Sequence, residues 1–205
     1  MILIGRYLSP FVRRTATVLT LTNTEFARKE LAAATDGEAL AEFNPLRRVP
    51  ALVLDDGEVL IDSAAIIDYV LDNHDSSHQL CPASGEARWR ILRTSAIATG
   101  AMEKTVAAAY ERSQRPKEKV HEPYREKLLD QVAAALSELE AQAEHVQYFG
   151  GDTPNLADVN TVVAYDFARI VAPEIAQQAA PQHLPALAAR ANALDAFAST
   201  RWRQE

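Results

Sequence analysis

Short apolar blocks alternate with polar turns over the first 76 residues, and this pattern predicts alternating strands and helices. Blocks that are short and apolar, or in one case short and charged, are predicted as strands: 2–4, 25–31, 51–54 and 59–61. Stretches with capping residues or apolar residues at helical spacing are predicted as helices: 10–21, 36–43 and 62–71. The Asp-Gly pair at 56–57 predicts a hairpin between the last two strands, because this pair tolerates positive φ. The predicted order is β-α-β-α-β-β-α.

The pattern changes at a polar, turn-forming stretch over 77–85, which we interpret as a linker. Beyond it we find no strand pattern. Stretches that are mostly Ala-rich, with apolar residues on one face, are predicted as helices: 86–111, 122–148, 155–170 and 185–197. We therefore predict an α/β domain over 1–76, a linker over 77–85 and an all-α domain over 86–205.

Composition and charge narrow the class of protein. Apolar residues make up 48% of the 205 residues and charged residues 24%, the balance of a globular protein rather than of a disordered chain. The 28 acidic and 21 basic residues leave a net charge of −7, so binding to a nucleic-acid backbone is not expected. Cys81 is the single cysteine and the five histidines lack metal-ligand spacing, so neither an internal disulfide nor a metal site is expected.

The chain has no segment that predicts membrane insertion. No apolar stretch reaches the roughly 20 residues of a membrane span. The first residues lack the basic region and the longer apolar run of a signal peptide. The sequence therefore predicts a cytoplasmic protein.

A Ser-Pro pair directly follows the first predicted strand. Ser is a favoured N-cap and Pro is favoured at the first helical position, so Ser9 and Pro10 predict a helix start. Capping alone is one interpretation of Ser9. In the other, its hydroxyl also donates to an anion such as a thiolate beyond the helix end, where the helix dipole favours negative charge. The two interpretations are compatible.

A Val-Pro pair precedes the third predicted strand. A proline before a buried strand removes a backbone N–H donor from the hydrogen bonds of the sheet, so its presence needs a reason. A cis Val49–Pro50 peptide bond is one such reason. The N–H and C=O of Val49 would then pair with a peptide-like ligand as a short added strand. Arg47 and Arg48 precede this pair, and they either meet a carboxylate or form a solvated basic turn.

An Asp-Ser pair begins the third predicted helix. Capping by Asp62 and Ser63 is a sufficient explanation for the pair. A helix N-terminus with a free hydroxyl also binds a carboxylate, and a neighbouring aspartate accepts from an ammonium group. Together the two residues would recognise an amino-acid head group.

These features, in this order, resemble the cytosolic glutathione transferase superfamily over essentially the whole chain. The segments that carry the resemblance are Ser9-Pro10-Phe11-Val12-Arg13-Arg14, Phe43-Asn44-Pro45-Leu46 with Val49-Pro50-Ala51-Leu52, and Asp62-Ser63-Ala64-Ala65-Ile66. In the second half, Asn155-Leu156-Ala157-Asp158 resembles the family's N-capping box, with Asn in place of Ser or Thr. The Ser-Pro-Phe start is similar to that of bacterial serine-type members and of the tau class, whereas omega-like members carry Cys at the position of Ser9.

The resemblance implies the glutathione transferase fold, with an α/β thioredoxin-like N-terminal domain and an all-α C-terminal helical bundle. It implies a cis Val49–Pro50 bond, with Val49 pairing to the cysteinyl backbone of glutathione. Asp62 and Ser63 would bind the γ-glutamyl head and Arg48 would reach the glycyl carboxylate. The implied catalytic residue is Ser9, which would hydrogen-bond the sulfur. The implied glutathione-binding residues are Phe11, Arg48, Val49, Pro50, Asp62 and Ser63.

The activity that the resemblance implies is transfer of glutathione, as its thiolate, to a small electrophilic or hydrophobic substrate. Glutathione is the co-substrate, no metal is implied, and the family is typically homodimeric. Residues proposed for the electrophile pocket are Met102, Val106, Tyr110, Tyr165 and Arg169. Helical spacing like that of the first three is more often found in ordinary helix–helix core. Three alternatives stay open: a glutathione-dependent peroxide or disulfide reductase, a non-enzymatic binding or regulatory protein, and a passive carrier of apolar ligands.

One residue departs from the family pattern. The position before the basic residue in the loop is commonly Gly, and here it is Arg47. If the position requires positive φ, Arg47 is strained there. This departure bears on the glycyl end of the glutathione site and favours the binding-protein alternative.

Overall fold

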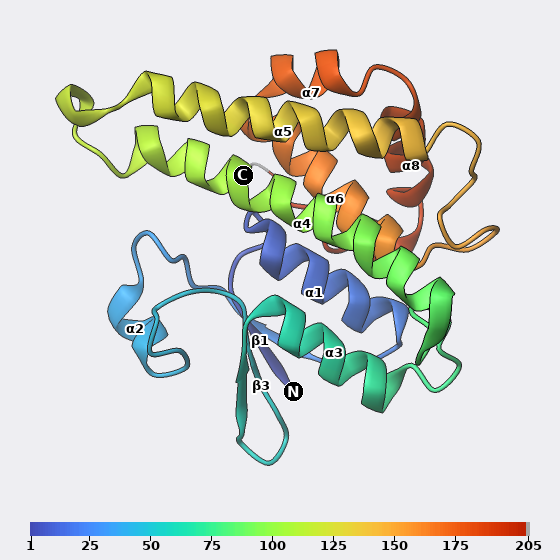
Figure 1. Cartoon of the computed structure of the whole chain (residues 1–205). Coiled ribbons are helices and arrows are strands. Elements are labelled where there is room, and N and C mark those ends of the chain that lie inside the picture. The colour runs from blue at the N-terminus through green and yellow to red at the C-terminus, as the bar shows by residue number, and fades with distance from the viewer. Residues whose placement is uncertain (204–205) are drawn as a thin grey trace. The chain divides into compact units, whose positions relative to one another are not determined.

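A computed structural model describes residues 1–203 and forms two compact units (Figure 1). The N-terminal unit comprises Met1–Leu80 and the described residues from Asn192 onward, and the helical unit comprises Cys81–Ala191. Residues 192–203 were expected in the helical domain but belong to the N-terminal unit. There the Oγ1 atoms of Thr17 and Thr200 lie 2.8 Å apart in a buried hydrogen bond.

A four-stranded mixed sheet forms one layer of the N-terminal unit, with strand order β2-β1-β3-β4. β1 pairs with β2 in parallel and with β3 antiparallel, and β3 pairs with β4 antiparallel. The strands are β1 (Ile2–Ile4), β2 (Ala27–Lys29), β3 (Ala51–Val53) and β4 (Val59–Ile61), all inside the predicted stretches. β2 lies at the sheet edge with all three residues exposed, which explains its charged pattern.

Three helices complete the predicted part of this unit: α1 (Pro10–Leu21), α2 (Gly37–Ala41) and α3 (Ser63–His74). α1 and α3 pack side by side, and both contact the sheet (Figure 1). Nine of the twelve residues of α1 are buried, among them Arg13 and Arg14. Leu3, Val12, Leu52 and Ile66 are fully buried, and Ile4 packs in a core cluster with Leu40 of α2 and Ala51 of β3.

Among residues 81–191 the helices are α4 (Gly85–Ser113), α5 (Glu122–Gln142), α6 (Leu156–Val171), α7 (Pro173–Ala179) and α8 (His183–Ala191). A short 3-10 helix covers Lys117–Lys119. α6 is the central helix: thirteen of its sixteen residues are buried, and it packs against α4, α7 and α8. The predicted capping box is confirmed, because Asn155 accepts from the Asp158 N–H and Asp158 accepts from the Asn155 N–H.

The structure differs from the predicted helices of the second half in three places. α5 ends at Gln142 rather than near 148, because the next residues turn back toward the Asp158 carboxylate, which binds the N–H groups of Phe149 and Gly150. α7 was not predicted, although Pro173 stands at its first position. The predicted helix 185–197 is broken into α8 and α9 (Asp195–Ala198), and Arg13 binds Asn192 in the break at 2.9 Å.

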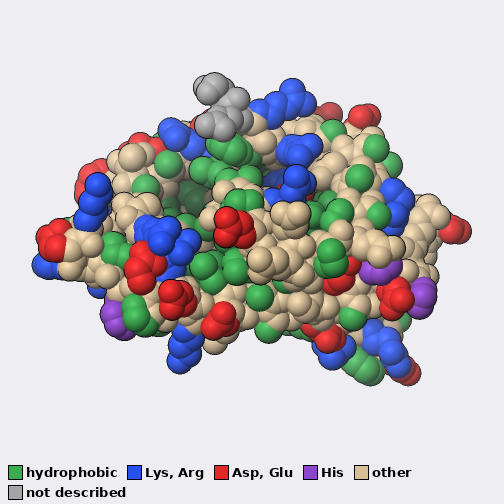
Figure 2. Space-filling view, turned by 90° about the horizontal axis from the view of Figure 1, so that it is seen from above, with side chains coloured by type: hydrophobic (Ala, Val, Ile, Leu, Met, Phe, Trp, Pro, Cys, Tyr) green, Lys and Arg blue, Asp and Glu red, His purple; other side chains and the backbone are tan. Residues whose placement is uncertain are grey.

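Two further properties concern the surface. No helix among residues 1–203 is both long and apolar enough to cross a membrane. On the face displayed in Figure 2, acidic and basic side chains are interspersed, without a broad patch of one sign.

Candidate functional site

The first candidate residue, Ser9, stands at the N-cap of α1 with extended backbone (φ −68°, ψ 121°), as predicted. Its C=O accepts from the Arg13 N–H at 3.0 Å, but its side chain makes no capping hydrogen bond. The half-buried hydroxyl therefore has no hydrogen-bond partner among residues 1–203. Beside it, the first-turn N–H groups of Phe11 and Val12 have no partner within the helix. The helix start is thus open to an anionic ligand.

Gly5 directly follows β1, four residues before Ser9, and the loop that contains Val49 passes close to it. Its φ of 131° is one that residues with a Cβ rarely adopt. A Cβ at this position would lie 2.5 Å from Cγ2 of Val12 and 3.0 Å from Cβ of Val49. The backbone approach that connects the two candidate segments therefore requires glycine here.

The Val49–Pro50 peptide bond is cis, as the resemblance implied. Val49 is partly exposed, and its N–H and C=O make no hydrogen bond with another described residue. Pro50 is buried beneath it. The backbone of Val49 is therefore free to pair with a peptide.

Asn44 organises the loop before Val49, a role that the sequence reasoning missed. Its buried side chain accepts from the Leu46 N–H and donates to the Arg48 C=O, each at 2.9 Å. Its own C=O accepts from the Arg47 N–H at 2.8 Å. The Asn-Pro pair at 44–45 is a turn-initiating dipeptide, and this signal could have indicated the role.

The two arginines of this loop have different environments. Arg47 has a φ of 53°, so the expected left-handed backbone is present at the family's glycine position. Its guanidinium turns to α2 and pairs with Glu38 at 2.8 Å. Arg48 is exposed and pairs with no acidic side chain among residues 1–203. Arg48 is therefore the cation available to a ligand carboxylate.

Asp62 and Ser63 start α3, as predicted. Asp62 has a φ of 70°, and its Oδ1 caps the helix by accepting from the Ala64 N–H at 2.8 Å. Ser63 is buried, and its Oγ lies 3.5 Å from Nη1 of Arg14 on α1. The sequence motif included Arg14, but the sequence reasoning assigned it no role. A carboxylate and a hydroxyl thus stand together at a helix N-terminus, the arrangement expected for an amino-acid head group.

Tyr7 is the other hydroxyl close in sequence to the start of α1. The Arg28 guanidinium lies 3.6 Å from its ring centroid. Burial raises the pKa of Tyr7, although Arg28 acts in the opposite direction. Tyr7 therefore stays a neutral phenol at ordinary pH.

The residues predicted for an electrophile pocket belong to the helical unit and differ in exposure. Met102 is fully buried in α4, which fits the alternative that it is helix–helix core. Val106 is half-buried, and Tyr110 is exposed. On α6, Tyr165 is buried, and the exposed Arg169 has its guanidinium 5.7 Å from the Tyr165 ring centroid. The assignment of these residues to a pocket stays a prediction.

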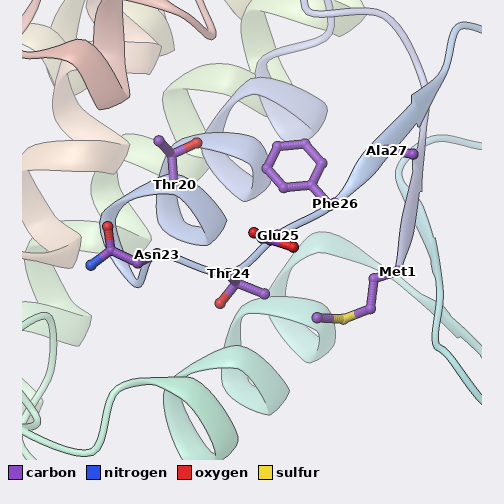
Figure 3. Close-up of a pocket in the computed structure, with 7 residues that line it drawn as sticks. All are labelled: Met1, Thr20, Asn23, Thr24, Glu25, Phe26 and Ala27. Carbon is purple, nitrogen blue, oxygen red and sulfur yellow. The ribbon is translucent and has the colours of Figure 1, made fainter.

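The remaining features add no chemistry to the candidate site. Within residues 1–203 no group of three or more His, Cys, Asp or Glu side chains is arranged to hold a metal. A shallow pocket of about 840 Å³ lies in the N-terminal unit at the end of α1 (Figure 3). None of the predicted site residues lines it: its residues are Met1, Thr20, Asn23, Thr24, Glu25, Phe26 and Ala27.

Comparison with known families matches both parts of the chain. Residues 3–78 match the glutathione S-transferase N-terminal domain, and residues 98–195 match the glutathione S-transferase C-terminal domain. Two curated relatives from Escherichia coli match over shorter stretches. The uncharacterized GST-like protein YibF of strain K12 is 29% identical over 111 residues, and glutathione S-transferase GstA of O157:H7 is 31% identical over 81. These matches cover 54% of the first protein and 39% of the second.

Solved structures match over nearly the full length. A glutathione transferase family member from Pseudomonas fluorescens Pf-5, with bound glutathione, is 30% identical over 99% of both chains, with a TM-score of 0.86. A glutathione S-transferase from Methylobacillus flagellatus with glutathione bound is 26% identical over 98% of both chains, with a TM-score of 0.88. A Methylobacterium radiotolerans structure at 21% identity shares the fold, with a TM-score of 0.90 over 100% of this chain and 96% of its own. Because both domain models and a full-length relative agree, this chain belongs to the cytosolic glutathione transferase superfamily.

Proposed function

We propose that this protein is a glutathione transferase that binds glutathione in its N-terminal unit and activates the thiol for attack on a small electrophile. The observation that carries the proposal is the hydroxyl of Ser9, which stands at the N-terminus of α1 without a hydrogen-bond partner among residues 1–203. Family members with bound glutathione support the choice of ligand.

Three parts of the unit would bind three parts of the tripeptide. The unpaired N–H and C=O of Val49 would take the cysteinyl backbone as a short added strand. Asp62 and Ser63, at the start of α3, would take the ammonium and carboxylate of the γ-glutamyl group. Arg48 would take the glycyl carboxylate, since Arg47 is directed to Glu38.

The chemical task of the site is to remove a proton from the thiol. A free thiol has a pKa near 8.5, so about two units of lowering, or roughly 2.7 kcal/mol, make it mostly thiolate at neutral pH. The Ser9 hydroxyl would donate to the sulfur, and the dipole of α1 favours the same negative charge. The thiolate then forms a bond to the electrophilic carbon, while either the bond to a leaving group breaks and that group departs with its electron pair, or the π bond of an activated alkene breaks and takes up a proton from water. The proton of the thiol leaves to solvent.

The electrophile itself is proposed only as a small, largely apolar molecule. Val106 and Tyr110 are the predicted pocket residues on α4 that retain exposed surface, and Arg169 is the exposed one on α6. We also expect a homodimer, as the family resemblance implies.

Thermal unfolding with and without a few millimolar glutathione is the first test. A ligand present at 100 times its Kd stabilises the folded state by about 2.7 kcal/mol, which raises Tm measurably. Absence of any shift would contradict the proposal and favour a non-enzymatic binding or regulatory protein.

Ser9→Ala then separates binding from activation. We expect it to retain glutathione binding, because the contacts at Val49, Asp62 and Ser63 are untouched, but to raise the pKa of the bound thiol. Thiolate absorbance titrated against pH in wild type and variant measures this shift. An unchanged titration curve would remove Ser9 from the mechanism.

A further inference from the structure

A buried arginine, Arg14, lies next to the N-terminus of α3. Arg14 lies on the second turn of α1 and is 5% exposed. Its Nη1 lies 3.5 Å from Oγ of Ser63, the first residue of α3. This is a long hydrogen bond, of the kind that tightens in many sites when a ligand binds.

The chemistry of the two groups sets the direction of that hydrogen bond. A guanidinium only donates, so the Ser63 oxygen must accept from Arg14. The hydroxyl proton of Ser63 then points away from Arg14, and no acceptor for it is found among residues 1–203. A buried hydroxyl proton without an acceptor is a site for a ligand acceptor.

Asp62 gives the same end of α3 its opposite charge. Its Oδ1 is occupied by the Ala64 N–H at 2.8 Å, and the residue is exposed. An ammonium group would meet the Asp62 carboxylate, whereas a carboxylate group would meet the Ser63 hydroxyl. The ammonium and the carboxylate of an α-amino acid would thus each be bound by one of two adjacent residues.

We propose that Arg14 is a positioning residue that acts through Ser63 to select the α-carboxylate of the γ-glutamyl group. The proposal rests on the proposed glutathione function. Arg14 holds the Ser63 oxygen and polarises its O–H, so that the hydroxyl donates a strengthened hydrogen bond to the carboxylate. Arg14 itself does not touch the ligand. Its effect is therefore confined to ligands that carry this carboxylate.

Two analogues of glutathione isolate the two charges. Glutaryl-Cys-Gly keeps the α-carboxylate and lacks the ammonium group, and 4-aminobutyryl-Cys-Gly keeps the ammonium and lacks the carboxylate. Isothermal titration gives the Kd of each for wild type and Arg14→Met. We expect Arg14→Met to raise the Kd of glutathione and of the glutaryl analogue about tenfold, the scale of one charge-assisted hydrogen bond. The Kd of the 4-aminobutyryl analogue should stay within about twofold, because it lacks the group affected.

Arg13→Met is the matched control. Arg13 is equally buried on the same helix, but its guanidinium binds Asn192 at 2.9 Å. The Arg13→Met variant should be less stable than wild type, but the ratios among its three Kd values should be unchanged. The double variant of Arg14→Met with Ser63→Ala should bind glutathione about as weakly as Ser63→Ala alone, because Arg14 acts through that hydroxyl.

If Arg14→Met raises the Kd of all three ligands equally, Arg14 has a structural role and the proposal is overturned. If none of the three Kd values changes, the proposal is also overturned. Additive losses in the double variant would overturn the route through Ser63. If Arg14→Met does not fold, Arg14→Gln, a neutral hydrogen-bond donor, must show the same ligand pattern at smaller size. Failure of wild type to bind glutathione would instead refute the proposed function itself.

Discussion

Glu140 holds the start of α8, and replacing it with glutamine tests how much this contact stabilises the helical unit. The residue is 9% exposed on α5. Its Oε1 accepts from the N–H groups of Gln182 at 2.9 Å and His183 at 2.7 Å, and its Oε2 accepts from Leu184 at 2.7 Å. These are first-turn donors, which have no partner within a helix.

The expected loss of stability follows from the number of side-chain oxygens that remain after the substitution. Glutamine keeps one oxygen, so at least one of the three N–H donors faces an amide NH₂ group instead. Leaving a buried donor unsatisfied costs about 1–3 kcal/mol, and losing the negative charge at the helix N-terminus costs about 0.3–1 kcal/mol more. We therefore expect Glu140→Gln to lower the free energy of unfolding by about 1.3–4 kcal/mol.

Urea unfolding of the full chain, followed by circular dichroism, measures this loss. Hydrogen exchange gives a local readout, since the amides of Gln182, His183 and Leu184 should lose protection first. Glu138→Gln is the control, because Glu138 lies on the same helix with 48% side-chain exposure. It pairs with Arg93 at 3.6 Å and accepts from Nε2 of Gln142 at 2.7 Å, and glutamine keeps an oxygen for the second contact. A loss below 0.5 kcal/mol, about the size of an ordinary surface substitution, or equal to that of Glu138→Gln, would refute the reasoning.

Three further predictions concern stability. Gly5→Ala should destabilise by about 2 kcal/mol or more, because a Cβ meets Val12 and Val49 at an unfavourable φ; an unchanged urea midpoint would contradict the close approach. Arg47→Gly should change stability by less than about 1 kcal/mol, since relief of left-handed strain offsets the lost Glu38 pair and the added chain entropy; a larger loss by thermal unfolding would contradict this. Burial raises the pKa of Asp158 from 3.8 to about 6, although hydrogen bonds from backbone N–H groups act in the opposite direction, so the folded state holds the carboxyl proton more tightly. The stability that Asp158 contributes is therefore full below pH 4 and is lost, by up to about 3 kcal/mol, as pH rises through 6. Asp158→Asn should lack this step in a pH series of urea unfolding curves.

Local signals in the sequence were sufficient for the elements that position the candidate site. Ser9-Pro10 marks the first residue of α1, because capping and the fixed φ of proline act within one turn. The capping box of α6 likewise depends on residues three apart, and both of its hydrogen bonds are present. β1 and β3 were recognised from apolar runs that are mostly buried in the sheet.

Contacts between distant residues were decided by the tertiary structure alone. Glu140 satisfies donors 42 to 44 positions away, and Arg14 meets Ser63 across 49 positions, so no local pattern predicts either contact. After α5, the Asp158 carboxylate accepts from the N–H of Phe149. In the break after α8, the Arg13 guanidinium donates to the side chain of Asn192. Burying a carboxylate or guanidinium without a partner is energetically unfavourable. These side chains therefore bind groups that packing places near them, even where a helix ends as a result. The sequence therefore determined where most elements begin, and the tertiary structure decided where several of them end and which partners the buried charges meet.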